Sequence, residues 1–103
     1  MTDGYERFFF KPIEPGVRIR FQYNRGPEPR YAVTLEAQID DEWTTLRCWD
    51  NAHEQGHHMH RYTRTDGKQE PVRFSYGASR EAMPEAMNAA VDGWKAILDQ
   101  WGR

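Results

Sequence analysis

This chain of 103 residues has little cysteine, no long apolar run and a small net charge. Cys48 is the only cysteine, so no disulfide can form within the chain and nothing indicates an oxidising compartment. The longest apolar stretch is far shorter than the roughly 18 residues that cross a membrane. The first residues also lack the basic-then-apolar order of a secretory signal. We therefore expect a cytoplasmic protein with no membrane partner.

The charge balance excludes one broad class of binding. A net charge of −2 at pH 7 and a pI near 6.1 argue against general electrostatic attraction to nucleic acid. Acidic residues concentrate at 40–42 and along the C-terminal segment, whereas arginines recur in the strand-like segments. A local basic face that contacts RNA therefore stays open as a hypothesis. The length suits one domain, residues 1–103, with a single core.

Alternating apolar and polar residues predict an antiparallel sheet over residues 17–77. Residues 17–23 and 31–39 alternate, and a polar turn at 40–42 leads into a third strand, 43–49. Residues 57–63 and 72–76 flank Asp66-Gly67, a strong hairpin signal. The aromatic run at 8–10 predicts that residues 1–16 form an N-terminal arm or a short strand. Together these segments indicate a meander of five to six strands.

The C-terminal segment, residues 79–101, has the three- and four-residue apolar spacing of an amphipathic helix. Ser79 is a candidate N-cap, Glu81 suits the first turn, and Gly102 ends the helix. Pro84 would then fall beyond the first turn, so the helix either begins near Pro84 or kinks there. The predicted fold class is α+β, with an antiparallel meander sheet packed on one C-terminal amphipathic helix.

One helix can cover only one face of such a sheet. Alternation assigns the following apolar residues to the covered face: Val17, Ile19, Phe21, Val33, Leu35, Ala37, Val72 and Phe74. It assigns the following residues to the open face: Arg18, Arg20, Gln22, Thr34, Glu36 and Arg73. In the third strand, uninterrupted alternation buries Leu46 and Cys48 and exposes Trp43, Arg47 and Trp49. An open sheet face that bears arginines is one clue to function.

All four histidines lie between residues 53 and 60, and Asp50 precedes them. Histidine is the side chain that titrates near neutral pH without perturbation, and it is a common metal ligand. In the strand 57–63, His58 and His60 share one face, about 7 Å apart, while Met59 points to the other. We expect Met59 in the core and the two imidazoles on the open face, in water beside the arginines.

Two kinds of chemistry fit this histidine pair. In the first, His58 and His60 act as acid and base on the 2′-hydroxyl and the leaving group of RNA, without a cofactor. In the second, they bind a divalent transition metal together with Asp50 or His53. The plain structural alternative is a solvated pair, with His57 also in water and Asp50 in a simple turn.

The second half of the chain resembles a family of small bacterial and archaeal proteins, which includes the TumE-like toxins of toxin–antitoxin pairs. The shared pattern is carried here by Trp49-Asp50-Asn51, Gly56, His58-Met59-His60 and Glu70-Pro71-Val72-Arg73-Phe74. The resemblance implies an α+β fold, Asp50, His58 and His60 as the shared polar residues, action on RNA, and a cognate antitoxin. The chain departs from the family pattern at His57, at Met59 and in the longer 61–69 hairpin.

Three functional hypotheses follow. The first is a TumE-like, RNA-cleaving protein in which His58 and His60 act as acid and base and Asp50 orients an imidazole. Its substrate would contact the following residues: Arg61, Arg73, Asn51, Arg18 and Arg20. The second is a metal- or small-ligand-binding protein that uses Asp50, His53, His58 and His60. The third is a non-enzymatic module whose open face forms a homodimer or partner interface.

Overall fold

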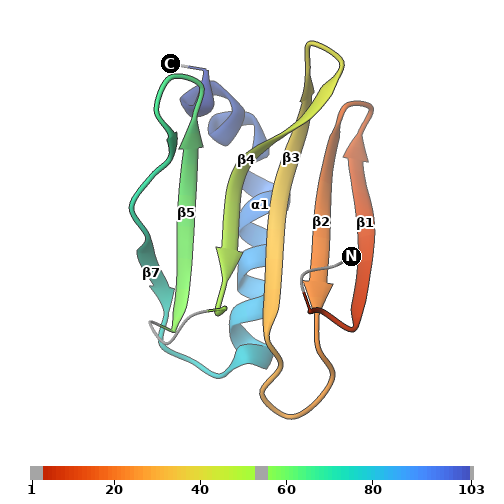
Figure 1. Ribbon diagram of the computed structural model, residues 1–103, viewed down its shortest axis with the longest axis vertical. Helices are drawn as coiled ribbons and strands as arrows, with labels where there is room; N and C mark the ends of the chain where they lie inside the picture. Colours follow the sequence, from red (N-terminus) through yellow and green to blue (C-terminus); the bar gives the residue numbers. More distant parts are fainter. Residues whose placement is uncertain (1–3, 53–55, 103) are drawn as a thin grey trace.

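The protein folds into one antiparallel sheet and one helix, as seen in a computed structural model that describes residues 4–52 and 56–102. The elements are β1 (Arg7–Glu14), β2 (Val17–Tyr23), β3 (Tyr31–Ile39), β4 (Glu42–Asp50), β5 (His57–Thr63), β6 (Gly67–Lys68), β7 (Val72–Ser75) and α1 (Ser79–Trp101). Strands β1 to β6 follow one another in the sheet, and β7 also pairs with β5 (Figure 1). The predicted α+β class is confirmed. The sheet has seven strands because residues 7–14 form a full strand and the hairpin adds the short β6.

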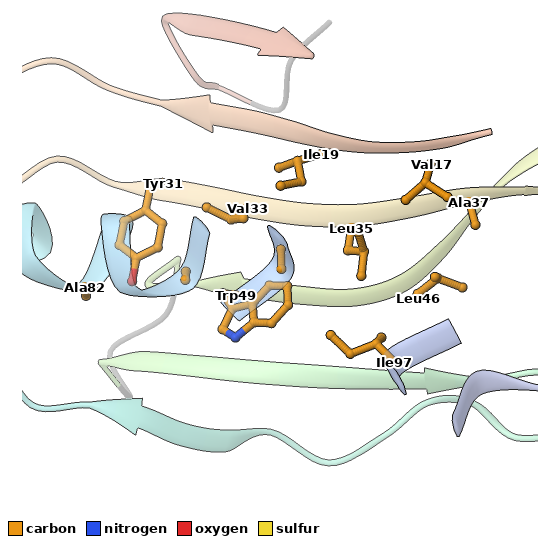
Figure 2. Close-up of a cluster of buried hydrophobic side chains, with 12 residues drawn as sticks. Val17, Ile19, Tyr31, Val33, Leu35, Ala37, Leu46, Trp49, Ala82 and Ile97 are labelled. Carbon is orange, nitrogen blue, oxygen red and sulfur yellow. The ribbon is translucent and has the colours of Figure 1, made fainter. Parts of the chain in front are cut away.

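The core lies between the sheet and α1, which runs behind the sheet in Figure 1 and packs on β3, β4 and β5. Ala82, Ala86 and Ala90 recur every four residues along α1 and are fully buried. Because residues four apart share one face of a helix and alanine is small, the helix backbone can approach the sheet closely. Figure 2 shows the side chains that fill the layer, among them Leu35 of β3 and Ile97 of α1.

The outer strands extend beyond the layer that α1 covers. In β7, Val72 is 48% exposed, so its assignment to the core is wrong. In β1, the rings of Phe8, Phe9 and Phe10 are all exposed, although β1 pairs with β2 along its whole length. The aromatic run therefore belongs to an edge strand, which is more than the arm or short strand predicted for residues 1–16.

Helix α1 begins without the expected side-chain cap. Ala78 occupies the N-cap position and makes no side-chain cap hydrogen bond, and the N–H of Ser79 donates instead to Glu28 Oε2 at 3.4 Å. The prediction that Ser79 is the cap is wrong, since Ser79 is already helical and its buried hydroxyl donates to Glu28 Oε2 at 3.1 Å. Pro84 lies inside the helix, which begins well before it, and Gly102 ends the helix as predicted.

A β-bulge in β4 interrupts the alternation that the sequence predicted. In the register of β3 and β4, Leu35 pairs with Arg47 but the next residue of β3 pairs with Thr45, which leaves Leu46 as the extra residue. An extra residue in a strand moves every side chain beyond it to the opposite face of the sheet. Trp49 therefore turns into the core, where it is 3% exposed, and Cys48 turns to the opposite face. The predicted exposure of Trp49 and the predicted place of Cys48 in the core are both wrong.

The face opposite α1 is less open than alternation predicted. Glu36 is buried because Arg18 lies against it, with Arg18 Nε donating to Glu36 Oε1 at 2.8 Å. The Arg18 guanidinium is itself held between the rings of Phe10 and Trp43, at 4.1 and 3.8 Å from their centroids. The following polar residues of this face are buried too: Gln22 and Thr34.

Candidate metal centre

The pairing of β4 with β5 brings the acid and two of the histidines together. Asp50 is opposite His58, and Cys48 is opposite His60, so all four side chains share the face away from α1. On the other face of the same strands, Met59 is opposite Trp49 and packs against the core. The predicted direction of β5, with Met59 inward and His58 and His60 on the opposite face, is confirmed.

The two imidazoles are not in water, however. His58 is 2% exposed and His60 is 6% exposed, so the expectation of solvated rings is wrong. Their centroids lie 5.0 Å apart with the ring planes nearly perpendicular. Two buried rings on the uncovered side of a sheet need polar partners within the protein, because burying a polar group without a hydrogen bond is costly.

Backbone carbonyls supply one partner to each ring. His58 Nδ1 lies 2.9 Å from the Gly56 oxygen, and His60 Nδ1 lies 3.2 Å from the Gln69 oxygen. A carbonyl oxygen can only accept, so both Nδ1 atoms carry protons. In a neutral ring the lone pair is then on Nε2. Gly56 has a φ of +79°, a conformation that glycine adopts without strain, and this turn brings its carbonyl to His58.

Asp50 completes the cluster. Its Oδ1 lies 3.1 Å from His58 Nε2 and accepts from the backbone N–H of Ala52 at 3.2 Å, while Cys48 Sγ donates to Oδ2 at 3.7 Å. One oxygen of Asp50 and one nitrogen each of His58 and His60 all lie within 4.8 Å of one another. Since His58 Nε2 and a carboxylate oxygen are both acceptors when His58 is neutral, a proton or a metal ion must lie between them.

The donor set fits a divalent transition metal. Two imidazole nitrogens and one carboxylate oxygen are ligands of zinc and of non-haem iron(II). Two atoms bound at about 2.1 Å to one tetrahedral ion are about 3.4 Å apart, so side-chain movements of up to about 1.4 Å would close the cluster on an ion. Nδ1–H···O=C bonds of this kind orient the rings of metal-binding histidines and would leave Nε2 of His58 and His60 to bind an ion.

Cys48 lies beside the cluster as a neutral thiol. Its Sγ accepts from Thr34 Oγ1 at 3.5 Å, and burial raises the pKa of the thiol to about 12. The neighbouring Asp50 carboxylate raises this pKa further, while the Thr34 hydroxyl opposes the shift. At neutral pH Cys48 is therefore protonated, in agreement with its role as a donor to Asp50.

His57 belongs to the other face and has a structural role. It is 7% exposed, so the alternative of a solvated His57 is wrong. Its Nε2 lies 2.8 Å from the Gly77 carbonyl and must donate, so its Nδ1 accepts from the Tyr31 hydroxyl at 2.8 Å. Tyr31 is fully buried, and this burial raises its pKa above the usual 10.0. Alternation gave no signal for this pair, because His57 and Tyr31 are 26 residues apart.

Three of the predicted substrate-binding residues lie away from the cluster or are otherwise engaged. Arg61 is opposite Arg47 on the helix side, where burial and the Arg61 charge lower the pKa of Arg47. Asn51 donates to the Pro29 carbonyl and accepts from the Tyr31 N–H, so it fixes the chain before β3. Arg18 is engaged by Glu36 and the two aromatic rings described above.

Two other arginines lie nearer the cluster. Arg73 is opposite His58, its guanidinium stacks on Tyr76 at 4.1 Å, and a methyl group added to Gly56 would meet that guanidinium at 3.0 Å. Arg20 lines a hollow on the same face as Cys48. His53, a fourth candidate metal ligand, lies outside the described residues.

These observations define a small α+β protein with a buried histidine–carboxylate cluster on the face opposite its helix. The chain belongs to the family described as Domain of unknown function (DUF7718), whose model matches residues 2–102. No curated protein and no solved structure matches the chain. The TumE-like resemblance stays a prediction. Within the described part of the chain, α1 falls short of the apolar length that a bilayer crossing requires.

Proposed function

We propose that the protein binds one divalent transition-metal ion through Asp50, His58 and His60. The observation that carries the proposal is the pair of Nδ1–H bonds to the carbonyls of Gly56 and Gln69, which puts the lone pair of each neutral ring on Nε2, with His58 Nε2 3.1 Å from Asp50 Oδ1. Three protein ligands leave at least one position of a tetrahedral ion free, which is typical of catalytic rather than structural metal sites.

Burial favours this function over metal-free acid–base catalysis on RNA. A general base must lie within about 3 Å of the proton that it removes. His58 and His60 are 2% and 6% exposed, so a 2′-hydroxyl within a polynucleotide would have little access to either ring. A single metal ion and a small ligand need far less room. The TumE-like, RNA-cleaving hypothesis and its cognate antitoxin remain a proposal with weaker geometric support.

The test is metal analysis of protein purified without a histidine tag, followed by titration with zinc and cobalt(II). We expect one equivalent per chain and a tetrahedral or five-coordinate cobalt spectrum. At a zinc concentration one hundred times Kd, selective binding to the folded state adds about 2.7 kcal/mol, which raises Tm by about 10–20 °C.

Two variants and a matched control locate the metal. Asp50→Asn and His58→Gln should each weaken zinc binding by about 10-fold or more, because each removes a ligand at little change in volume. The control is His57→Phe, which changes a neighbouring buried histidine of β5 that faces the helix side. The proposal is refuted if the wild-type protein binds less than stoichiometric zinc and shows no thermal shift. It is equally refuted if His57→Phe loses the metal while Asp50→Asn keeps it.

A further inference from the structure

A hollow of about 390 Å³ lies on the same face as the Asp50/His58/His60 cluster. Its existence follows from the order of side chains across the sheet. Thr34 of β3 lies between Arg20 of β2 and Cys48 of β4, and Ala32 lies between Gln22 and Asp50. Ala32 and Thr34 are small, so the middle strand forms a low floor between two higher walls. One wall carries Arg20, and the other carries Cys48, which contacts Asp50 at 3.7 Å.

Arg20 has hydrogen-bonding capacity that the described residues do not use. Its Nε is buried and has no hydrogen-bond partner among them, and its NH2 nitrogen lies 3.7 Å from Glu36 Oε2, too far for a strong bond. Glu36 is already engaged at 2.8 Å by Arg18. A guanidinium with unused N–H groups can donate two parallel hydrogen bonds to a carboxylate or a phosphate.

The rest of the lining favours the same class of ligand. Arg30 adds a second positive charge at the hollow, and its guanidinium lies 5.8 Å from the ring centroid of Tyr5, another lining residue. Thr45 and Tyr62 also line the hollow, and each carries a hydroxyl group of the kind that can donate to an oxyanion. Among the residues that the structure describes, no aspartate or glutamate lines the hollow. The only charged side chains in this part of the lining are those of the two arginines.

We propose that this hollow binds a small organic oxyanion, a carboxylate or a phosphate, whose charged group is held by Arg20 and whose other end lies at Cys48, beside the Asp50/His58/His60 cluster. The inference deepens and rests on the proposed metal function. Arg20 and Cys48 are two strand spacings apart, about 10 Å, which a small molecule with an anionic group at one end can cover. The volume admits such a small molecule and is too small for a folded polymer segment.

The test uses zinc-loaded, 15N-labelled protein titrated with inorganic phosphate and, separately, with succinate. We expect one of these anions to shift the side-chain Nε–H signal of Arg20. The anion that acts identifies the phosphate or carboxylate class. The Arg20→Gln variant should bind that anion at least 10-fold more weakly and bind zinc as the wild type does, because Glu36 keeps its bond to Arg18. The matched control is Arg64→Gln, which removes an exposed arginine of the β5–β6 turn, outside the hollow.

The outcomes separate the two proposals. If neither anion perturbs Arg20 up to about 10 mM, where even millimolar affinity would be detected, the hollow is not an oxyanion site whatever the zinc result. Equal weakening by Arg20→Gln and Arg64→Gln would also overturn the inference, since it would indicate a general charge effect. If zinc fails to bind but the Arg20 signal still shifts, the metal function is refuted and the link from the anion to the metal is overturned with it.

Discussion

The Tyr31–His57 hydrogen bond should be a coupled structural unit, and a double-mutant cycle can measure the coupling. His57→Phe replaces a buried imidazole with an apolar ring and removes the acceptor of the Tyr31 hydroxyl. Tyr31 is fully buried, so the hydroxyl left behind cannot turn to water. Leaving a buried donor unsatisfied costs about 1–3 kcal/mol, whereas removing both partners together is nearly neutral. The Gly77 carbonyl also loses a donor, but Gly77 is exposed and water can replace it.

The magnitudes follow from this asymmetry. We expect His57→Phe and Tyr31→Phe each to lower the free energy of unfolding by about 1–3 kcal/mol. The double variant should cost no more than the larger single change, with a coupling energy of about 1 kcal/mol or more. The assay is urea denaturation at neutral pH, with midpoints compared at constant m-value. Zinc binding, measured in parallel, should be retained in all three variants.

Additivity would refute this reasoning. If the double variant lost the sum of the two single effects to within about 0.5 kcal/mol, Tyr31 and His57 would be acting independently. The 2.8 Å contact would then not be the reason for burying a histidine on the helix side of β5.

Two further predictions concern protonation. Burial raises the pKa of Tyr31 above 10.0, so the folded protein keeps the phenol proton at a pH where the unfolded chain loses it. The free energy of unfolding should therefore fall by up to about 1.4 kcal/mol per pH unit as the pH rises above 10. Tyr31→Phe should remove that part of the slope, which equilibrium unfolding at pH 9 to 11 would reveal; an unchanged slope would contradict it. Burial raises the pKa of Cys48 from an ordinary 9.0 to about 12, which lowers its thiolate fraction about a thousandfold. Iodoacetamide at pH 8 should therefore alkylate Cys48 far more slowly in the native protein than in the urea-unfolded chain. Similar rates in both states, followed by mass spectrometry, would show that the thiol is exposed.

The sequence predicted those parts of the fold in which a single period persists. Alternation in β2 and β3 identified Ile19 and Leu35 as core residues, and both are fully buried. The helical spacing after residue 78 gave α1 almost to the residue. The N-terminal strand β1 was underestimated because Phe8, Phe9 and Phe10 are consecutive aromatics that show no alternation, and pairing with β2 rather than burial makes them a strand.

The candidate site was only half predictable, and the bulge in β4 is the reason. Uninterrupted alternation places Asp50 on the same face as Leu46, toward the helix, and so away from His58. The extra residue at Leu46 moves Asp50 to the other face, where it is opposite His58. Nothing in the local sequence marks this insertion, because Thr45, Leu46 and Arg47 each suit a strand. The histidine pair was visible from spacing, but the carboxylate that joins it depends on register.

The burial of the pair was unpredictable for a different reason. The partners of His58 and His60 are the backbone carbonyls of Gly56 and Gln69. Every residue type has such a carbonyl, so the residue types alone do not show which carbonyls the turns bring to the two rings. Gly56 indicates the turn, since its positive φ aims the backbone at His58. Once both Nδ1 protons are fixed by groups that can only accept, Nε2 of a neutral His58 is an acceptor that lies 3.1 Å from another acceptor, Asp50 Oδ1, beside the buried ring of His60. Such an arrangement is unfavourable unless a proton or a metal ion lies between the two acceptors, which is why the buried cluster is compatible with the proposed metal site and not with a solvated histidine pair.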